Sequence, residues 1–66
     1  MFTVTKTYHG DETPMYLGNT SSLDKAKKML VELLVASQEL DLHPDMRVDG
    51  MGFNDLYASY EITDWS

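Results

Sequence analysis

Apolar residues recur at helical spacing in one long segment, residues 21–40, and this pattern predicts an amphipathic α-helix. Ser21 or Ser22 can cap its start, and Pro44 cannot continue a helix, so the helix is expected to end near Leu40. The stripe expected to face a core consists of Leu23, Ala26, Met29, Leu30, Leu33, Leu34 and Leu40.

Two valines of this segment, Val31 and Val35, fall outside the stripe and lie one helical turn apart. Two interpretations are open. Either a strand or loop half covers them, or they form a second apolar ridge that contacts a partner, most simply a second copy of the chain. Because valines at this spacing fit a contact across a two-fold axis, Val31 and Val35 are the candidate dimer interface.

Short segments with alternating or β-branched residues flank the helix and predict strands. The four expected strands span residues 2–8, 15–18, 46–50 and 56–63. Pro14 indicates either a strand start or a sheet edge, and residues 51–55 are expected to form a turn. The resulting order, β-β-α-β-β, predicts an α+β fold in a single domain over residues 1–66. One helix then packs on a four-stranded, mainly antiparallel sheet.

Alternation also assigns residues to the two faces of the expected sheet. The helix-facing side is expected to hold Phe2, Val4, Leu17, Val48, Leu56, Ala58, Tyr60 and Ile62. The opposite side is expected to display Thr3, Thr5, Thr7, Tyr57, Ser59 and Thr63, with Trp65 at its margin. An antiparallel sheet can leave such a face in water, and its aromatic residues would also suit a docking surface.

The chain has 66 residues and no cysteine, so neither a disulfide framework nor a cysteine zinc site can stabilise it. A domain of this size buries only about 60% of its unfolded surface, and oligomerisation is one common source of further stability. The first ten residues alternate instead of forming an apolar run, which argues against a signal peptide. We therefore expect a cytoplasmic protein without membrane association, located in the host cell if a phage encodes it.

The charge of the chain says more about its binding partners than the rest of its composition does. The formal net charge is −6, and from Met29 onward Arg47 is the one basic residue against eight acidic ones. A surface of this sign repels nucleic acid and favours a basic partner. The alternative is that the charge only keeps the domain from aggregating. The basic cluster of Lys25, Lys27 and Lys28 is too small for a general grip on phosphates.

The sequence offers little for catalysis or metal binding. His9 lies near Asp11 and Glu12, and His43 near Asp41 and Asp45, but neither group has the spacing of a zinc or calcium site. No serine occupies a nucleophile elbow, and the four glycines are too scattered for a phosphate-binding loop. We therefore expect no enzyme activity, no catalytic residue, no metal and no cofactor.

Protein binding is the remaining class of function. We expect an acidic interaction protein, an inhibitor or modulator that docks on a basic surface of a nucleic-acid-handling protein. Small, acidic, cysteine-free chains are typical of phage and mobile-element accessory proteins that counter host enzymes or defence systems. The alternative is a homodimeric scaffold module, joined through Val31 and Val35 or by strand pairing at an exposed sheet edge. A small-molecule binder or enzyme ranks last. The residues expected to contact the basic partner are Asp41, Asp45, Asp49 and Asp55.

Overall fold

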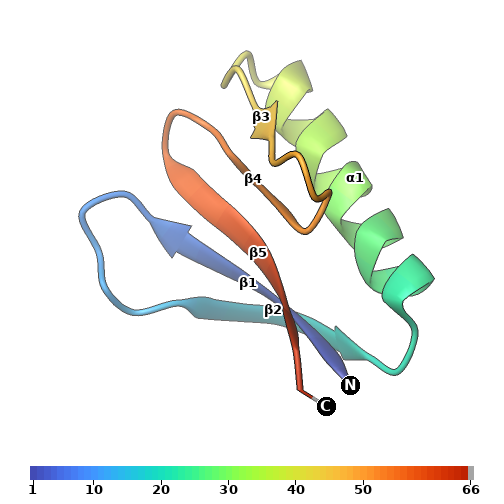
Figure 1. The fold of residues 1–66 in the computed structure, drawn as a ribbon. Coiled ribbons are helices and arrows are strands. Elements are labelled where there is room, and N and C mark those ends of the chain that lie inside the picture. The colour runs from blue at the N-terminus through green and yellow to red at the C-terminus, as the bar shows by residue number, and fades with distance from the viewer. Residues whose placement is uncertain (66) are drawn as a thin grey trace.

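The computed structural model describes residues 1–65, which form one helix and five strands (Figure 1). The elements in chain order are β1 (Phe2–Tyr8), β2 (Met15–Thr20), α1 (Leu23–Glu39), β3 (Asp45–Met46), β4 (Gly52–Asn54) and β5 (Ala58–Asp64). All strands join one sheet in the order β2-β1-β5-β4-β3, and every neighbouring pair is antiparallel. The predicted α+β class is confirmed, whereas the predicted number of strands is one too low.

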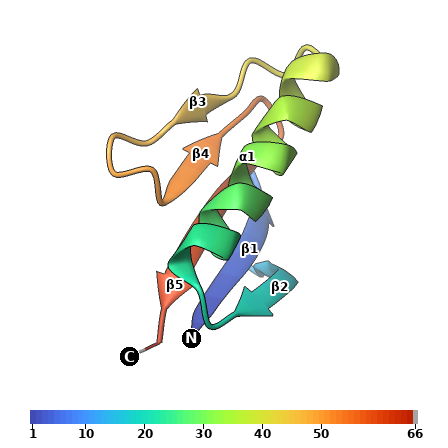
Figure 2. The same ribbon diagram turned by 90° about the vertical axis from the view of Figure 1, so that its right-hand side faces the viewer.

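Helix α1 lies across one face of the sheet, with β2 on one side of it and β3 and β4 on the other (Figure 2). The first and last strands, β1 and β5, are direct neighbours near the middle of the sheet. The core between the layers contains Val4, Ala26, Leu30, Phe53, Ala58, Tyr60 and Ile62. Within residues 1–65 no helix is both long and apolar enough to cross a bilayer.

The helix forms close to the predicted bounds, and Ser22 is its cap. The Ser22 backbone is extended, with φ −111°, and its side-chain oxygen accepts a hydrogen bond from the Lys25 N–H at 3.4 Å. The predicted stripe packs against the sheet except for Leu40, which is 71% exposed. Leu40 follows the last helical residue, and the left-handed Asp41 (φ 60°) then turns the chain away from the helix axis.

The second half of the sheet differs most from the prediction. The expected strand over residues 46–50 is reduced to β3, and the expected turn over residues 51–55 contains β4. Gly50, with φ 69°, supplies the turn that was expected further along the chain. Phe53 is consequently a core residue, 1% exposed, and its ring stacks on Tyr60 with 4.3 Å between centroids.

Three residues expected in the core are exposed instead. Val48 lies in the loop between β3 and β4, and Leu56 lies in the turn before β5. Leu17 lies at the open edge of the sheet, where a register shift between β1 and β2 leaves it without a Cα partner. Alternation alone does not separate these positions from core positions because it does not reveal where a strand stops.

The sheet face away from the helix has the expected polar character. Its central rows contain half-buried hydroxyl side chains from Thr3, Thr5, Thr7, Ser59 and Thr63. Trp65 packs at the margin, where its indole N–H donates to the Thr3 hydroxyl oxygen at 3.0 Å. Tyr57 is exposed in the turn before β5 and does not belong to these rows.

Candidate functional site

The acidic residues chosen from the sequence lie mostly on one segment, the connection from the end of α1 to the start of β4. Asp41 follows the helix, Asp45 begins β3, and Asp49 lies in the loop between β3 and β4. All three side chains are exposed. Because β3 is the outermost strand on this side, the segment forms one border of the sheet, which we call the acidic edge (Asp41, Asp45 and Asp49).

Backbone hydrogen bonds hold the acidic edge against the rest of the domain. The Leu42 N–H donates to the Ser37 carbonyl oxygen, and the Leu42 carbonyl oxygen accepts from the Leu56 N–H, both at 3.0 Å. Left-handed backbone at Asp41 and His43 directs the chain from the helix end into β3. Aspartate tolerates this conformation better than most residues do, so the same side chain serves the turn and the surface charge.

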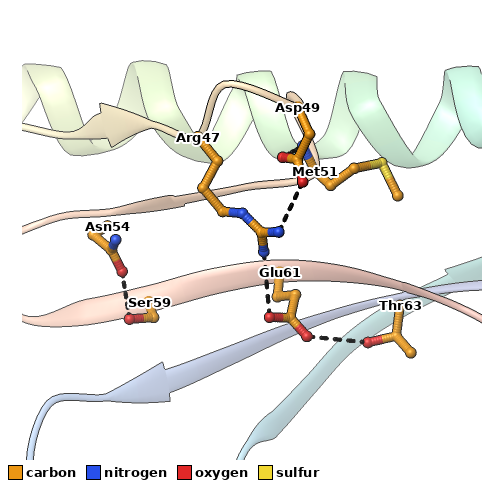
Figure 3. A network of polar contacts seen from close by, with 7 residues as sticks. All are labelled: Arg47, Asp49, Met51, Asn54, Ser59, Glu61 and Thr63. Carbon is orange, nitrogen blue, oxygen red and sulfur yellow. Dashed lines mark hydrogen bonds and ion pairs between the residues drawn. The ribbon is translucent and has the colours of Figure 1, made fainter.

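The loop of the acidic edge is closed by Arg47. Its guanidinium donates to Asp49 at 2.8 Å and reaches Glu61 on β5 at 3.5 Å (Figure 3). The carboxylate of Asp49 also accepts the Met51 N–H at 2.9 Å. This hydrogen bond, followed by the attraction of Arg47, holds the pKa of Asp49 below its ordinary value of 3.8. Asp49 is thus ionised and largely balanced by one cation.

Asp41 and Asp45 carry the unbalanced charge of this edge. The nearest cationic group to Asp41 is the His43 ring at 3.9 Å, and this pair is charged only when the histidine is protonated. Among residues 1–65, Asp45 has no ion-pair partner. These two carboxylates are therefore the groups of this edge that lysine or arginine side chains of a partner could pair with.

Asp55 is the exception among the four, and its assignment to an exposed acidic surface is wrong. Its side chain is 8% exposed and accepts hydrogen bonds at 2.8 Å from the Ser37 hydroxyl and from the Tyr57 and Ala58 N–H groups. Burial by itself would raise the pKa of Asp55, but these hydrogen bonds and Lys6 outweigh it, and the pKa is lowered. Asp55 joins the β4–β5 turn to the last turn of α1.

The candidate dimer interface on the helix is partly exposed. Val31 is 50% exposed and Val35 is 43% exposed, so no strand or loop covers either of them fully. Their helical positions lie on the flank of α1 opposite Met29, the side chain that reaches β2. Their role as an interface stays a prediction.

Hollows on the surface formed by residues 1–65 include two that are shallow and open to solvent. One, of about 600 Å³, follows the acidic edge and is lined by Asp45, Met46, Arg47, Val48 and Asp49. The other, of about 320 Å³, lies between β2 and the helix and is lined by Leu17, Met29, Glu32 and Leu33. No three histidine or acidic side chains within residues 1–65 come together as metal ligands would.

The histidine of the first turn has a structural contact. The Nε2 atom of His9 lies 2.8 Å from the Asp55 carbonyl oxygen, so it connects the β1–β2 turn to the β4–β5 turn. Sequence reasoning missed this contact and also the apolar hollow beside β2. A signal for the hollow was present, because the β2 sequence MYLGNT contains no charged residue in a strongly charged chain.

Comparison with known proteins adds no relative. No protein-family model matches the chain, and no curated protein or solved structure is significantly similar to it.

Proposed function

We propose that this chain is a small, non-enzymatic interaction protein that docks through its acidic edge on a basic surface of a nucleic-acid-handling protein, as an inhibitor or modulator. The observation that carries the proposal is the exposed pair Asp41 and Asp45 on a segment that backbone hydrogen bonds fix to the domain. Carboxylates can take the place of phosphates in binding a basic surface, and because the backbone of this segment is already fixed, it loses little conformational entropy on binding.

The balance of charge around this edge supports the same class of partner. Arg47 is the one basic residue after Met29, and its guanidinium is engaged by Asp49 and Glu61. A basic protein therefore meets little repulsion as it approaches. Electrostatic attraction of this kind accelerates association and weakens with salt, over a screening length of about 8 Å at physiological ionic strength.

The test is capture of the partner from a lysate of the encoding organism by the immobilised chain. We expect a basic nucleic-acid-binding protein that is released by heparin and by raising the salt concentration. The variant Asp41→Asn/Asp45→Asn should lose most of this binding, and asparagine suits the left-handed backbone at residue 41.

A matched control distinguishes binding through the acidic edge from binding driven by net charge alone. The variant Asp11→Asn/Glu12→Gln removes the same two charges from the exposed β1–β2 turn and should bind as well as the parent chain. Equal loss in both double variants, or capture that heparin and salt do not reverse, would contradict the proposal.

A homodimeric scaffold module is the second candidate function, and the exposure of Val31 and Val35 is the observation that favours it. If the helices meet there, Val35→Asp should convert dimers to folded monomers in sedimentation velocity. Unchanged sedimentation of this variant would reject that interface.

A further inference from the structure

The strand β2 is an edge strand of unusual composition for this chain. It pairs only with β1, so the backbone groups on its outer side have no strand partner within residues 1–65. It is six residues long and uncharged, and Met15, Tyr16 and Leu17 on it are exposed. Apart from the bulge at Leu17, this uncharged and exposed edge is open to pairing with another strand.

The middle of β2 is marked by contacts with the helix. Leu17 is the extra residue at the register shift, and it lines the hollow of about 320 Å³ together with Met29 and Leu33. The end of the Met29 side chain lies directly over Gly18, where a Cβ atom would collide with it. Met29 therefore stands above the centre of β2, on the helix side of the sheet.

Two residues of opposite charge lie before and after Met29 on the same flank of α1. Lys25 lies four residues before it and Glu32 three residues after it, which places all three on one helix flank. Both charged side chains are exposed, and neither belongs to an ion pair among residues 1–65. A two-fold axis beside the outer edge of β2, perpendicular to the sheet, reverses the direction of this helix flank in the second copy, so that Lys25 of one copy faces Glu32 of the other.

From these observations we infer that β2 pairs with β2 of a second copy, antiparallel about a two-fold axis. The two five-stranded sheets then form one continuous sheet, and the two helices lie side by side on the same face. The two β1 strands would be three strand spacings apart, about 14 Å. Helices centred over β1, each about 10 Å wide, leave a gap that long side chains such as Met29 can fill.

The arrangement keeps the acidic edges of the two copies apart. They lie at the two far ends of the joined sheet, so the carboxylates of Asp41, Asp45 and Asp49 in one copy are separated from those in the other by both sheets. At the contact, Lys25 of each copy faces Glu32 of the other copy, which gives two symmetric pairs of opposite charge. The inference does not depend on the proposed function of the acidic edge, because it uses the other edge.

The first experiment is sedimentation equilibrium of the full chain over a wide concentration range. We expect reversible association to a dimer. Leu17→Asp places a charge from each copy in the contact and should leave a monomer with an unchanged far-ultraviolet circular dichroism spectrum. Val35→Asp, on the opposite helix flank, should dimerise as the parent chain does.

The second experiment exchanges the charges. Lys25→Glu and Glu32→Lys should each weaken dimerisation about tenfold, because each variant makes like charges face one another twice. The double variant Lys25→Glu/Glu32→Lys should restore the parent affinity, since the exchanged pair is again complementary.

Three results would overturn the inference. The chain could remain monomeric at all concentrations, Val35→Asp instead of Leu17→Asp could dissociate the dimer, or the double charge exchange could fail to restore association. Loss of dimerisation in Leu17→Asp with intact heparin-sensitive capture would leave the acidic-edge proposal standing, so the two proposals fail separately.

Discussion

The two edges of the sheet differ in how far they are protected from pairing with a strand of another molecule. An edge strand exposes unpaired backbone groups, and folded proteins commonly guard such strands by shortness, charge or proline. The β3 edge has two residues and lies among Asp41, Asp45 and Asp49, so it is both short and charged. The β2 edge has six residues and no charge. The β3 edge is therefore protected by shortness and charge, whereas the β2 edge is protected only by the bulge at Leu17 and by Pro14 before its start.

The interior beneath the two edges also differs. Beneath the acidic edge lie the buried residues Phe53 and Asp55, and Gly52 admits a close backbone approach. Beneath the β2 edge the closest contact is the flexible end of Met29 over Gly18. Substitutions of these buried residues should therefore destabilise the domain, whereas substitutions of exposed residues on the β2 edge should mostly change its surface.

The largest expected difference is between two aromatic residues. Phe53→Ala removes a fully buried ring that stacks on Tyr60, and it should lower the free energy of unfolding by about 4 kcal/mol. Tyr16→Ala on the β2 edge, where the ring is 65% exposed, should change it by less than about 0.5 kcal/mol. Urea denaturation of dilute protein measures both changes in the free energy of unfolding. Similar losses in the two variants would mean that the two sides of the sheet do not differ in their contribution to stability.

The next effect concerns the buried carboxylate. Asp55→Ala leaves the Ser37 hydroxyl and two backbone N–H groups without their acceptor, and it should cost about 3 kcal/mol of unfolding free energy. Because the pKa of Asp55 is lowered in the fold, its ionised form contributes stability that is fully present above its ordinary pKa of 3.8. That stability is lost as the pH falls through the native pKa.

The pH dependence distinguishes this contribution from simple packing. The urea midpoint of the parent chain should decrease as the pH is lowered below about 4, and that of Asp55→Asn should decrease less steeply. Parallel curves for the two proteins would show that Asp55 is not the group responsible.

A smaller difference in stability is expected between alanine substitutions at two glycines. A Cβ atom at Gly52 would lie 2.5 Å from the Tyr60 carbonyl oxygen and 3.1 Å from Cδ of Arg47, so Gly52→Ala should displace β4 and cost about 2 kcal/mol. At Gly18 the obstacle is the end of the Met29 side chain, which can rotate away. Gly18→Ala should cost less than about 1 kcal/mol in the same urea assay. A larger loss at Gly18 would mean that Met29 is held rigidly over β2.

The secondary structure of the first half of the chain was predicted from the local sequence pattern more accurately than that of the second half. The helix and β1 were predicted within two residues because their apolar periodicity is long and uninterrupted. In the second half a turn was expected over residues 51–55, which include Gly52, but the turn forms at Gly50, which had been assigned to the preceding strand. Gly52 is required because other groups approach its backbone closely, and the linear sequence does not reveal a close approach.

The candidate site was predicted only in part for a related reason. Asp41, Asp45 and Asp49 share one short segment, so their grouping followed from position along the chain. The burial of Asp55 depends on Ser37, eighteen residues away, and on a β4–β5 turn that had been placed differently. An aspartate before a turn that can accept N–H groups two and three residues later is a local signal for this role.

The central position of β5 has a consequence for how the protein is made. During synthesis β1, β2 and the helix leave the ribosome before β5, the strand that joins the two halves of the sheet. Until β5 emerges, Val4 and Leu30 lack the partners Tyr60 and Ile62, and the nascent chain has no complete core. Folding of this domain therefore waits until β5 has left the ribosome, and chains truncated within β5 should be degraded as unfolded polypeptides.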